Sequence, residues 1–397
     1  MFLATTSKMS RGTSKSVKAL LRPVVLPPNL IGTRAPCDLF NVQGVLLVSA
    51  DSVIGFSIRN PFRLTRVFCN ADQAALISDV NPIARLGQIG MNLAEIADRL
   101  ARRQTVSLNE LSTLSRTLYE TWVQDADACL GYAHQCKSGR PSIRHAVFVS
   151  LLVAELAAAH RLDNEQIVDF IGGALTMNIA KLSLHDEMYD CSATPNPGQL
   201  TEIRSHPFES RRLLENTGKF EKSWLDAVGS HHENIDGSGY PQSLKGAKIA
   251  LSARMLRVAD IFAARLTGRK KRRPLYWNIR RTRSTQDIVQ HVFCNDQRHL
   301  DPPLMNQLIG TLGRFPPGSL VRLNNLELAV VARRIPGELA TPPETLSIRD
   351  NQGRILDPPR LRNIGHGEYE IRNYANEESQ RLLSYDWQKI WGYGTAS

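Results

Sequence analysis

The sequence predicts a mainly α-helical protein, with a small β-rich module before the helices and a small β appendage after them. Three observations predict this fold class. Residues 24–90 carry short apolar runs broken by Pro, Gly and Asp, as in short strands. From Met91 to about residue 300, apolar residues recur at three- and four-residue steps, as on one face of a helix. Beyond Pro302, apolar and polar residues alternate around turn signals.

These patterns divide the chain into six regions. We expect a disordered basic N-terminus, a β-rich module without an assigned role, a helical linker, an all-helical domain, a β appendage and a C-terminal tail. In chain order the predicted boundaries are 1–23, 24–90, 91–135, 136–300, 301–372 and 373–397.

In the predicted helical linker, four apolar residues fall on one face of a helix: Leu111, Leu114, Leu118 and Trp122. This face suits packing against the next domain, and a dimer-forming helix would have the same pattern, so a homodimer stays open. In the appendage, turns are predicted at Asn324-Asn325 and at 350–353. The tail contains Trp387 and Trp391, which are interpreted as a packing latch or a partner contact.

Two polar residues fall on apolar faces of predicted helices. Asn178 shares its face with Ile171, Ala174, Leu175 and Leu182, and Asp260 shares its face with Ala253, Leu256 and Ala263. A buried Asn needs hydrogen-bond partners, which an ordinary core or a former metal site would both supply. A buried carboxylate is costly unless it is paired or metal-bound, which favours a functional role for Asp260.

The composition is that of an ordinary soluble protein: 397 residues, 42% hydrophobic and 22% charged. No apolar run approaches the length of a membrane span, so no membrane contact is expected. The N-terminus lacks the apolar core of a secretory signal. Six cysteines without paired spacing indicate a reducing compartment, and a cytoplasmic location is therefore expected.

The densest charge is the run Arg269–Arg273, continued by Arg280, Arg281 and Arg283. It contributes to a net charge of +11, from 49 basic and 38 acidic residues. Exposed positive charge suits nucleic acid or a solvated helix edge.

The most informative segment is HHENIDGSGYP, residues 231–241. Neutral imidazoles are the commonest metal ligands, so His231 and His232 are candidates for a metal site. Glycines give a tight reversal, and a proline fixes its exit. The loop residues singled out are Asp236, Gly237, Gly239, Tyr240 and Pro241.

In these motifs the chain resembles the HD-GYP branch of the HD-domain metal-dependent phosphohydrolases, over about residues 136–300. The residues that match the family's metal ligands are His145, His206, His231, His232 and Asp260. The resemblance implies an all-helical domain. In active members it also implies hydrolysis of the bacterial second messenger cyclic di-GMP by a two-metal site.

The HD pair of the family is missing. Its place is taken by Met177 and Asn178, while Lys181 preserves the lysine that follows; Pro141 stands where some members carry a Glu for an extra metal. The dipeptide His185-Asp186 lies eight residues downstream of the expected place. On a continuous helix it would be displaced by roughly 12 Å, so it is interpreted as a coincidence in a polar surface loop.

This departure weakens one metal position. The family's bridging Asp is replaced by the amide of Asn178, a degenerate catalytic position, and the Met177 thioether binds Fe²⁺ or Mn²⁺ poorly. We expect the position that keeps His145 and Asp260 to be weak or empty. The position with His206, His231 and His232 is expected to hold one divalent ion, Fe or Mn, or none.

Two functions from different classes remain. The first is a degenerate protein of cyclic di-GMP signalling, with weak or no hydrolysis, that binds the cyclic dinucleotide or a partner. Lys181 and Arg269 match phosphate-contacting residues of the family, and the GYP loop matches a surface thought to recruit diguanylate cyclases. The second is an active phosphodiesterase with a modified or mononuclear site. Nucleic-acid binding through residues 269–283 is a distant alternative.

Overall fold

The computed structural model describes residues 21–26, 30–41, 44–55, 66–77, 80–189, 191, 193–267, 298–334, 342–365, 367–375 and 385–393. The predicted disordered N-terminus up to residue 20 lies outside them. The basic run 269–283, with Arg269, lies outside them as well.

The N-terminal module is a small antiparallel sheet. Its strands, in the order β1-β4-β2-β3, are β1 (Leu21–Val25), β4 (Arg66–Asn70), β2 (Leu39–Phe40) and β3 (Leu46–Val48). A 3-10 helix, η3 (Ala71–Leu76), follows β4. The first α-helix then begins at Pro82, earlier than the predicted start at Met91, because Asn81 caps the backbone nitrogens of Ile83 and Ala84.

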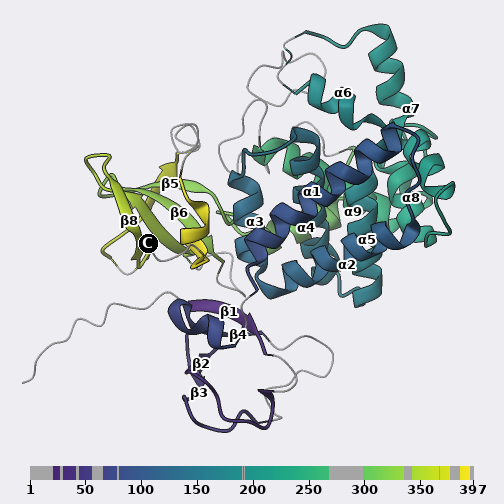
Figure 1. The fold of residues 1–397 in the computed structure, drawn as a ribbon. Helices are drawn as coiled ribbons and strands as arrows, with labels where there is room; N and C mark the ends of the chain where they lie inside the picture. The colour runs from purple at the N-terminus through teal and green to yellow at the C-terminus, as the bar shows by residue number, and fades with distance from the viewer. Residues whose placement is uncertain are drawn as a thin grey trace, which may run out of the picture.

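The helical domain is built around one buried helix. Nearly every residue of α4 (Pro141–Ala159) between Ala146 and Ala157 is fully enclosed. Its neighbours in contact are α1 (Pro82–Ala101), α2 (Leu108–Gln124), α3 (Ala126–Gln135), α5 (Asn164–Thr176), α6 (Leu182–Glu187), α9 (Leu251–Thr267) and α11 (Pro302–Leu312). The predicted linker helices therefore belong to the same core as the predicted domain. In Figure 1, α7 (Pro197–Glu215) and α8 (Lys222–Ser230) lie at the end of this domain away from the C-terminal sheet.

The helix predicted to run through Leu182 breaks earlier. Helix α5 ends at Thr176, Asn178 has φ −108° and ψ 13°, and a 3-10 turn, η4 (Ile179–Lys181), leads into α6. Met177 is fully buried in the main core. The assumption of a continuous helix was thus wrong, and so was the loop position predicted for His185, which lies buried in α6.

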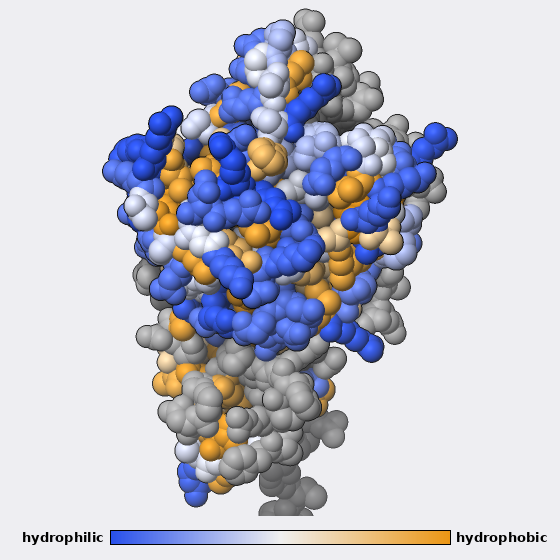
Figure 2. Space-filling model, turned by 90° about the vertical axis from the view of Figure 1, so that its right-hand side faces the viewer, coloured by the Kyte–Doolittle hydropathy of each residue, from blue (hydrophilic) through white to orange (hydrophobic). Residues whose placement is uncertain are grey.

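Two helical stretches, Pro141–Ala159 and Asn164–Glu187, are long and apolar enough to span a membrane, which corrects the statement that no such run exists. In the most apolar 18 residues of each stretch, 78% of the residues are buried inside the fold. On the face shown in Figure 2, hydrophilic side chains predominate over the helical part, with smaller hydrophobic areas between them. These stretches are therefore explained as core helices.

The C-terminal sheet is antiparallel and has the strand order β8-β7-β6-β5-β9. Its strands are β5 (Leu320–Leu323), β6 (Leu328–Arg333), β7 (Glu344–Arg349), β8 (Ile355–Arg362) and β9 (Ile371–Tyr374). Both predicted turns are confirmed, between β5 and β6 and between β7 and β8. The segment before the sheet differs from the prediction, because residues 302–312 form α11 and pack on the helical core.

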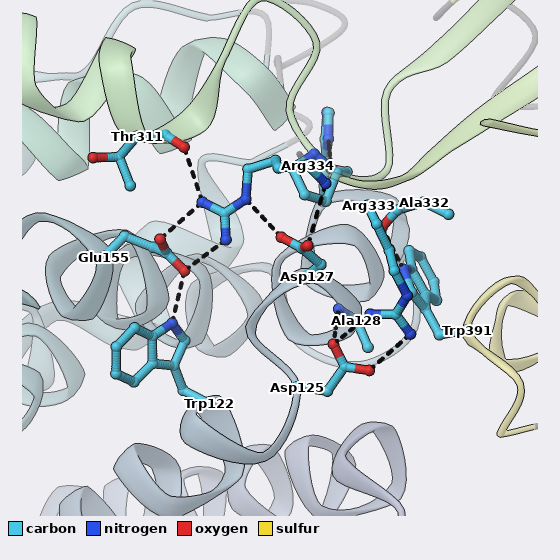
Figure 3. A network of polar contacts seen from close by, with 12 residues as sticks. Trp122, Asp125, Asp127, Ala128, Glu155, Thr311, Ala332, Arg333, Arg334 and Trp391 are labelled. Atoms are coloured by element: carbon cyan, nitrogen blue, oxygen red, sulfur yellow. Dashed lines mark hydrogen bonds and ion pairs between the residues drawn. The ribbon is translucent and has the colours of Figure 1, made fainter. Parts of the chain in front are cut away.

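A buried charge network joins the sheet to the helices (Figure 3). Arg334, after β6, pairs with Asp127 of α3 at 2.6 Å and with Glu155 of α4 at 2.8 Å. Beside it, Arg333 pairs with Asp125, the N-cap of α3, at 2.9 Å. These charges are withdrawn from water, so each depends on its partners.

The C-terminal tail closes over this junction. Trp391 lies in a 3-10 helix, η7 (Trp387–Trp391), is fully buried, and donates from its indole nitrogen to Ala332 O at 2.9 Å. The Tyr393 hydroxyl lies 3.0 Å from a carboxylate oxygen of Asp125. The tryptophan is therefore a packing latch within the chain.

Replacing the buried arginine should destabilise the protein strongly. We expect Arg334→Met to cost about 3–5 kcal/mol, because Asp127 and Glu155 would be left as uncompensated buried charges. The exposed pair Arg116–Glu165 is the matched control, and Arg116→Met should cost less than about 1 kcal/mol. Denaturant unfolding of both variants measures the difference. Equal costs would contradict a structural role for the network.

Candidate metal centre

Two histidines from neighbouring helices have their imidazoles fixed by main-chain carbonyls. His206 lies within α7, and its Nδ1 is 2.6 Å from Ile203 O. His231 ends α8, and its Nδ1 is 2.8 Å from Val228 O. Because a carbonyl oxygen only accepts, both Nδ1 atoms must carry the hydrogen. This assignment leaves both Nε2 atoms with their lone pairs.

These two Nε2 atoms face each other across 3.0 Å in a fully buried place. Two lone pairs at that distance repel unless a cation or a proton lies between them. A metal ion bonded to both, at about 2.0–2.1 Å from each nitrogen, would separate them by roughly 3.0–3.4 Å. The donor set and its spacing therefore fit a divalent metal ion.

His232 completes a cluster with them. Its ring centroid lies 4.3 Å from that of His231 and 5.0 Å from that of His206. Within the described part of the chain, this is the one group of three possible ligand residues whose donor atoms lie within 4.8 Å of one another. The sequence prediction that His206, His231 and His232 come together is thus matched by the geometry.

All three imidazoles are held neutral. Burial is the main cause and lowers the pKa of His231 to about 4, and it lowers the pKa of His206 and His232 well below the ordinary value. The Lys181 ammonium adds to this effect at all three rings. Neutral imidazole is the form that binds metal, and the effect of Lys181 places its charge close to the cluster.

The loop after the histidines is held from inside. The Glu233 carboxylate, which sequence reasoning did not single out, is buried and accepts from the backbone nitrogens of Gln242 at 2.6 Å and Leu244 at 2.9 Å. At Gly239 a Cβ would lie 2.2 Å from Asn234 N, so only glycine fits there. These contacts fix the backbone path of the loop.

Other loop residues turn to the cluster or to solvent. The Tyr240 ring stacks on His232 with centroids 4.8 Å apart. Asp236 accepts from the backbone nitrogen of Ser238 at 3.0 Å, and Gly237 has φ +86°. Pro241, which follows a cis peptide bond, is exposed. The loop expected to be exposed is thus exposed only in part, at its tip around Ser238 and at its end, Pro241.

The second predicted ligand position is a closed pair. His145 Nε2 lies 2.7 Å from Asp260 Oδ1. Burial, the largest single influence, raises the pKa of Asp260, but the hydrogen bond from His145 and the electrostatic effect of His145, Arg257 and His231 together outweigh it and lower this pKa below the ordinary value. The His185 ring stands edge-on, with its centroid 5.5 Å from that of His145, so the prediction of a surface coincidence was wrong. The possible ligand atoms of these three residues do not all lie within 4.8 Å of one another.

The residues in place of the HD pair lie beside α7. The backbone nitrogen of Ala180 donates to Ser210 Oγ at 3.2 Å, one turn beyond His206 on α7. Asn178 is 7% exposed, and its Oδ1 has no hydrogen-bond partner among the described residues. Such a buried acceptor is costly, and it suits a place where a ligand or ion supplies the partner.

Taken together, the helical fold and the buried histidine cluster form a candidate metal centre. The sequence of residues 98–301 matches the family model described as HD domain. The chain therefore belongs to the HD domain family. The resemblance to its HD-GYP branch agrees with relatives that are named as cyclic di-GMP phosphodiesterases.

A cyclic di-GMP phosphodiesterase of Pseudomonas aeruginosa is 26% identical over 306 residues, which are 76% of this chain and 66% of that protein. The 3'3'-cGAMP-specific phosphodiesterase 1 of Vibrio cholerae is 31% identical over 151 residues, 38% of this chain and 33% of that protein. A cyclic di-GMP phosphodiesterase response regulator of Xanthomonas campestris is 30% identical over 195 residues, 47% of each chain. The chain spans at most 66% of the length of these relatives.

Among solved structures, an HDG"Y"P protein from Bdellovibrio bacteriovorus aligns with a TM-score of 0.47 and 11% identity. The alignment covers 72% of this chain and 98% of that one.

The neutral histidines predict an acid-sensitive fold in the metal-free protein. Their pKa values are lowered on folding, so between the unfolded value of 6.5 and about 4 the unfolded chain binds more protons. The contribution of these histidines to the free energy of unfolding is therefore fully present above pH 6.5, and it is lost as the pH drops towards 4. We expect the thermal midpoint to fall by several degrees between about pH 7 and pH 5.

Changing both His206 and His231 to Gln should flatten this dependence. His160→Gln, which removes an exposed imidazole, should leave it intact. A thermal midpoint of the unaltered chain that stays level or rises on acidification would refute buried neutral histidines.

Proposed function

We propose that this chain is an HD-GYP-type protein of cyclic di-GMP signalling that binds a cyclic dinucleotide and has weak or no hydrolytic activity. The observation that carries the proposal is the replacement of the HD pair. Met177 is enclosed in the apolar core, and Asn178 offers an uncharged amide where the family has a carboxylate. The two donors of the HD pair are thereby lost from the metal position that keeps His145 and Asp260.

The ion-binding capacity that remains belongs to the histidine cluster. His206 and His231 would hold one divalent ion, Fe or Mn, through their facing Nε2 atoms. When bound, such an ion polarises a phosphate oxygen and lowers the pKa of a bound water. The residues of the chain do the rest: two carbonyls orient the imidazoles, and Lys181 contributes positive charge for an anionic ligand.

The other position argues for slow turnover. Its bridging carboxylate is replaced by the amide of Asn178, and the two residues that remain there, His145 and Asp260, are engaged with each other at 2.7 Å. Without the bridge, stabilisation of the developing charge falls by several kcal/mol, which corresponds to orders of magnitude in rate.

A second candidate is an active cyclic di-GMP phosphodiesterase with a mononuclear site. The 3.0 Å spacing of the two Nε2 atoms favours it, because it suits one ion without further rearrangement. The relatives are named for either of two ligands, cyclic di-GMP and 3'3'-cGAMP, so both are candidates here.

Partners are proposed on narrower grounds. The exposed tip of the GYP loop offers a surface for a diguanylate cyclase or another signalling protein. A cytoplasmic location and a homodimer remain proposals from the sequence. Arg269 as a phosphate contact, and nucleic-acid binding through residues 269–283, rest on sequence alone.

The decisive experiment measures binding and turnover of both cyclic dinucleotides by protein reconstituted anaerobically with Fe²⁺ or Mn²⁺. We expect binding without measurable hydrolysis. Asn178→Asp alone should leave hydrolysis low, because Met177 still withholds an imidazole. The double change Met177→His with Asn178→Asp should raise it, because it returns both an imidazole and a carboxylate to that metal position.

The control is His206→Ala together with His231→Ala, which removes the proposed ion. Hydrolysis by the unaltered protein that disappears in this control would establish the second candidate instead. Absence of binding for both dinucleotides, in a folded protein, would overturn both candidates.

A further inference from the structure

An arginine that the sequence did not single out reaches the histidine cluster. Arg257 stands on α9, one turn before Asp260. Its Nη1 lies 3.2 Å from His232 Nδ1, and its Nη2 donates to Asn234 Oδ1 at 3.0 Å. The guanidinium is therefore held by two contacts with the segment that follows α8.

This contact fixes which nitrogen of His232 carries hydrogen. A guanidinium only donates, so Nδ1 of His232 must accept with its lone pair. A neutral imidazole has one lone pair and one N–H, so the hydrogen lies on Nε2. At His206 and His231 the opposite holds, since their Nδ1 atoms donate to carbonyls. One ring of the cluster is thus reversed with respect to the other two.

The reversed ring has no lone pair left for a metal ion. Its Nε2 is buried and has no hydrogen-bond partner within the described residues. A buried N–H without a partner costs free energy, and an oxygen of a bound anion or water would satisfy it. Ligation through Nε2 would instead require a hydrogen on Nδ1, pointed at a cation that cannot accept it.

We propose that Arg257 is a positioning residue that keeps Nε2 of His232 as a hydrogen-bond donor. The ion is then held by the imidazoles of His206 and His231, and His232 donates a hydrogen bond to an oxygen of the phosphodiester. This inference rests on the proposed function and deepens it. The guanidinium also places a positive charge beside the site, which disfavours a further cation and favours an anionic ligand.

The test is a double-mutant cycle on metal affinity, measured with Co²⁺ by calorimetry and by its visible absorption. In the unaltered protein, His206→Ala and His231→Ala should each weaken Co²⁺ binding by at least about tenfold, while His232→Ala changes it less than about threefold. In an Arg257→Met background His232 can reverse its tautomer. There, His232→Ala should cost at least about tenfold.

The cycle separates the tautomer from the charge. Loss of the guanidinium charge alone raises Co²⁺ affinity, but it leaves the cost of His232→Ala the same in both backgrounds. Arg257→Lys keeps a donor and a charge, and it should behave as the unaltered protein. If His232→Ala weakens Co²⁺ binding in the unaltered protein as much as His231→Ala does, the proposal is wrong.

A second measurement does not need metal binding. In ¹⁵N spectra of the metal-free protein, assigned with the His232→Ala variant, Nδ1 of His232 should have the shift of an unprotonated nitrogen and Nε2 that of an N–H nitrogen. The reverse assignment would overturn the proposal. Failure of Co²⁺ to bind, with this tautomer observed, would instead overturn the metal site of the proposed function.

Discussion

The site depends on one constraint: the Nε2 atoms of His206 and His231 are buried and face each other at 3.0 Å, each with a lone pair. The carbonyls of Ile203 and Val228 create it, because each takes the Nδ1 hydrogen of one histidine and turns the other nitrogen inward. With His206 within α7 and His231 at the end of α8, a cation between the two nitrogens relieves the repulsion of their lone pairs. A divalent ion does so with ordinary bond lengths, and the neutral state of the rings at physiological pH leaves it no proton to displace.

The remainder of the site is organised around positive charge. Lys181 and Arg257 both act on the histidines electrostatically, and Asp260 is hydrogen-bonded to His145. A two-metal centre needs carboxylates to offset its ions, and here the bridging carboxylate has become the amide of Asn178. In the proposed function, this arrangement keeps affinity for an anionic ligand and lacks the donors for a second ion, so that binding is the main capacity of the fold.

The sequence predicts much of this arrangement, and its failures have physical causes. His231, His232 and the glycines after them lie in one short segment, so their chemistry is visible in the spacing. The end of helix α5 before Met177 could not be predicted, because Asn178 continues the spacing of the apolar stripe although the helix has ended. His185 was misplaced for the same reason.

Contacts between residues that are far apart in the chain could not be predicted from the spacing of residues in the sequence. Arg333 and Arg334 meet Asp125 and Asp127, which lie about two hundred positions earlier, and only the packed fold brings them together. The apolar stripe of α9 indicated Asp260 but not Arg257, which lies one turn before it. The partner of Arg257, His232, comes from another part of the chain. The tautomer of that histidine depends on this contact and on nothing in its own neighbourhood of the chain.

The central claim is a single ion between His206 and His231. The most direct measurement is anomalous scattering from crystals of the full chain loaded with Mn²⁺, collected above and below the metal absorption edge. We predict one peak, within bonding distance of both Nε2 atoms. A second peak beside His145 and Asp260, or the absence of a peak between the two histidines, would contradict the account.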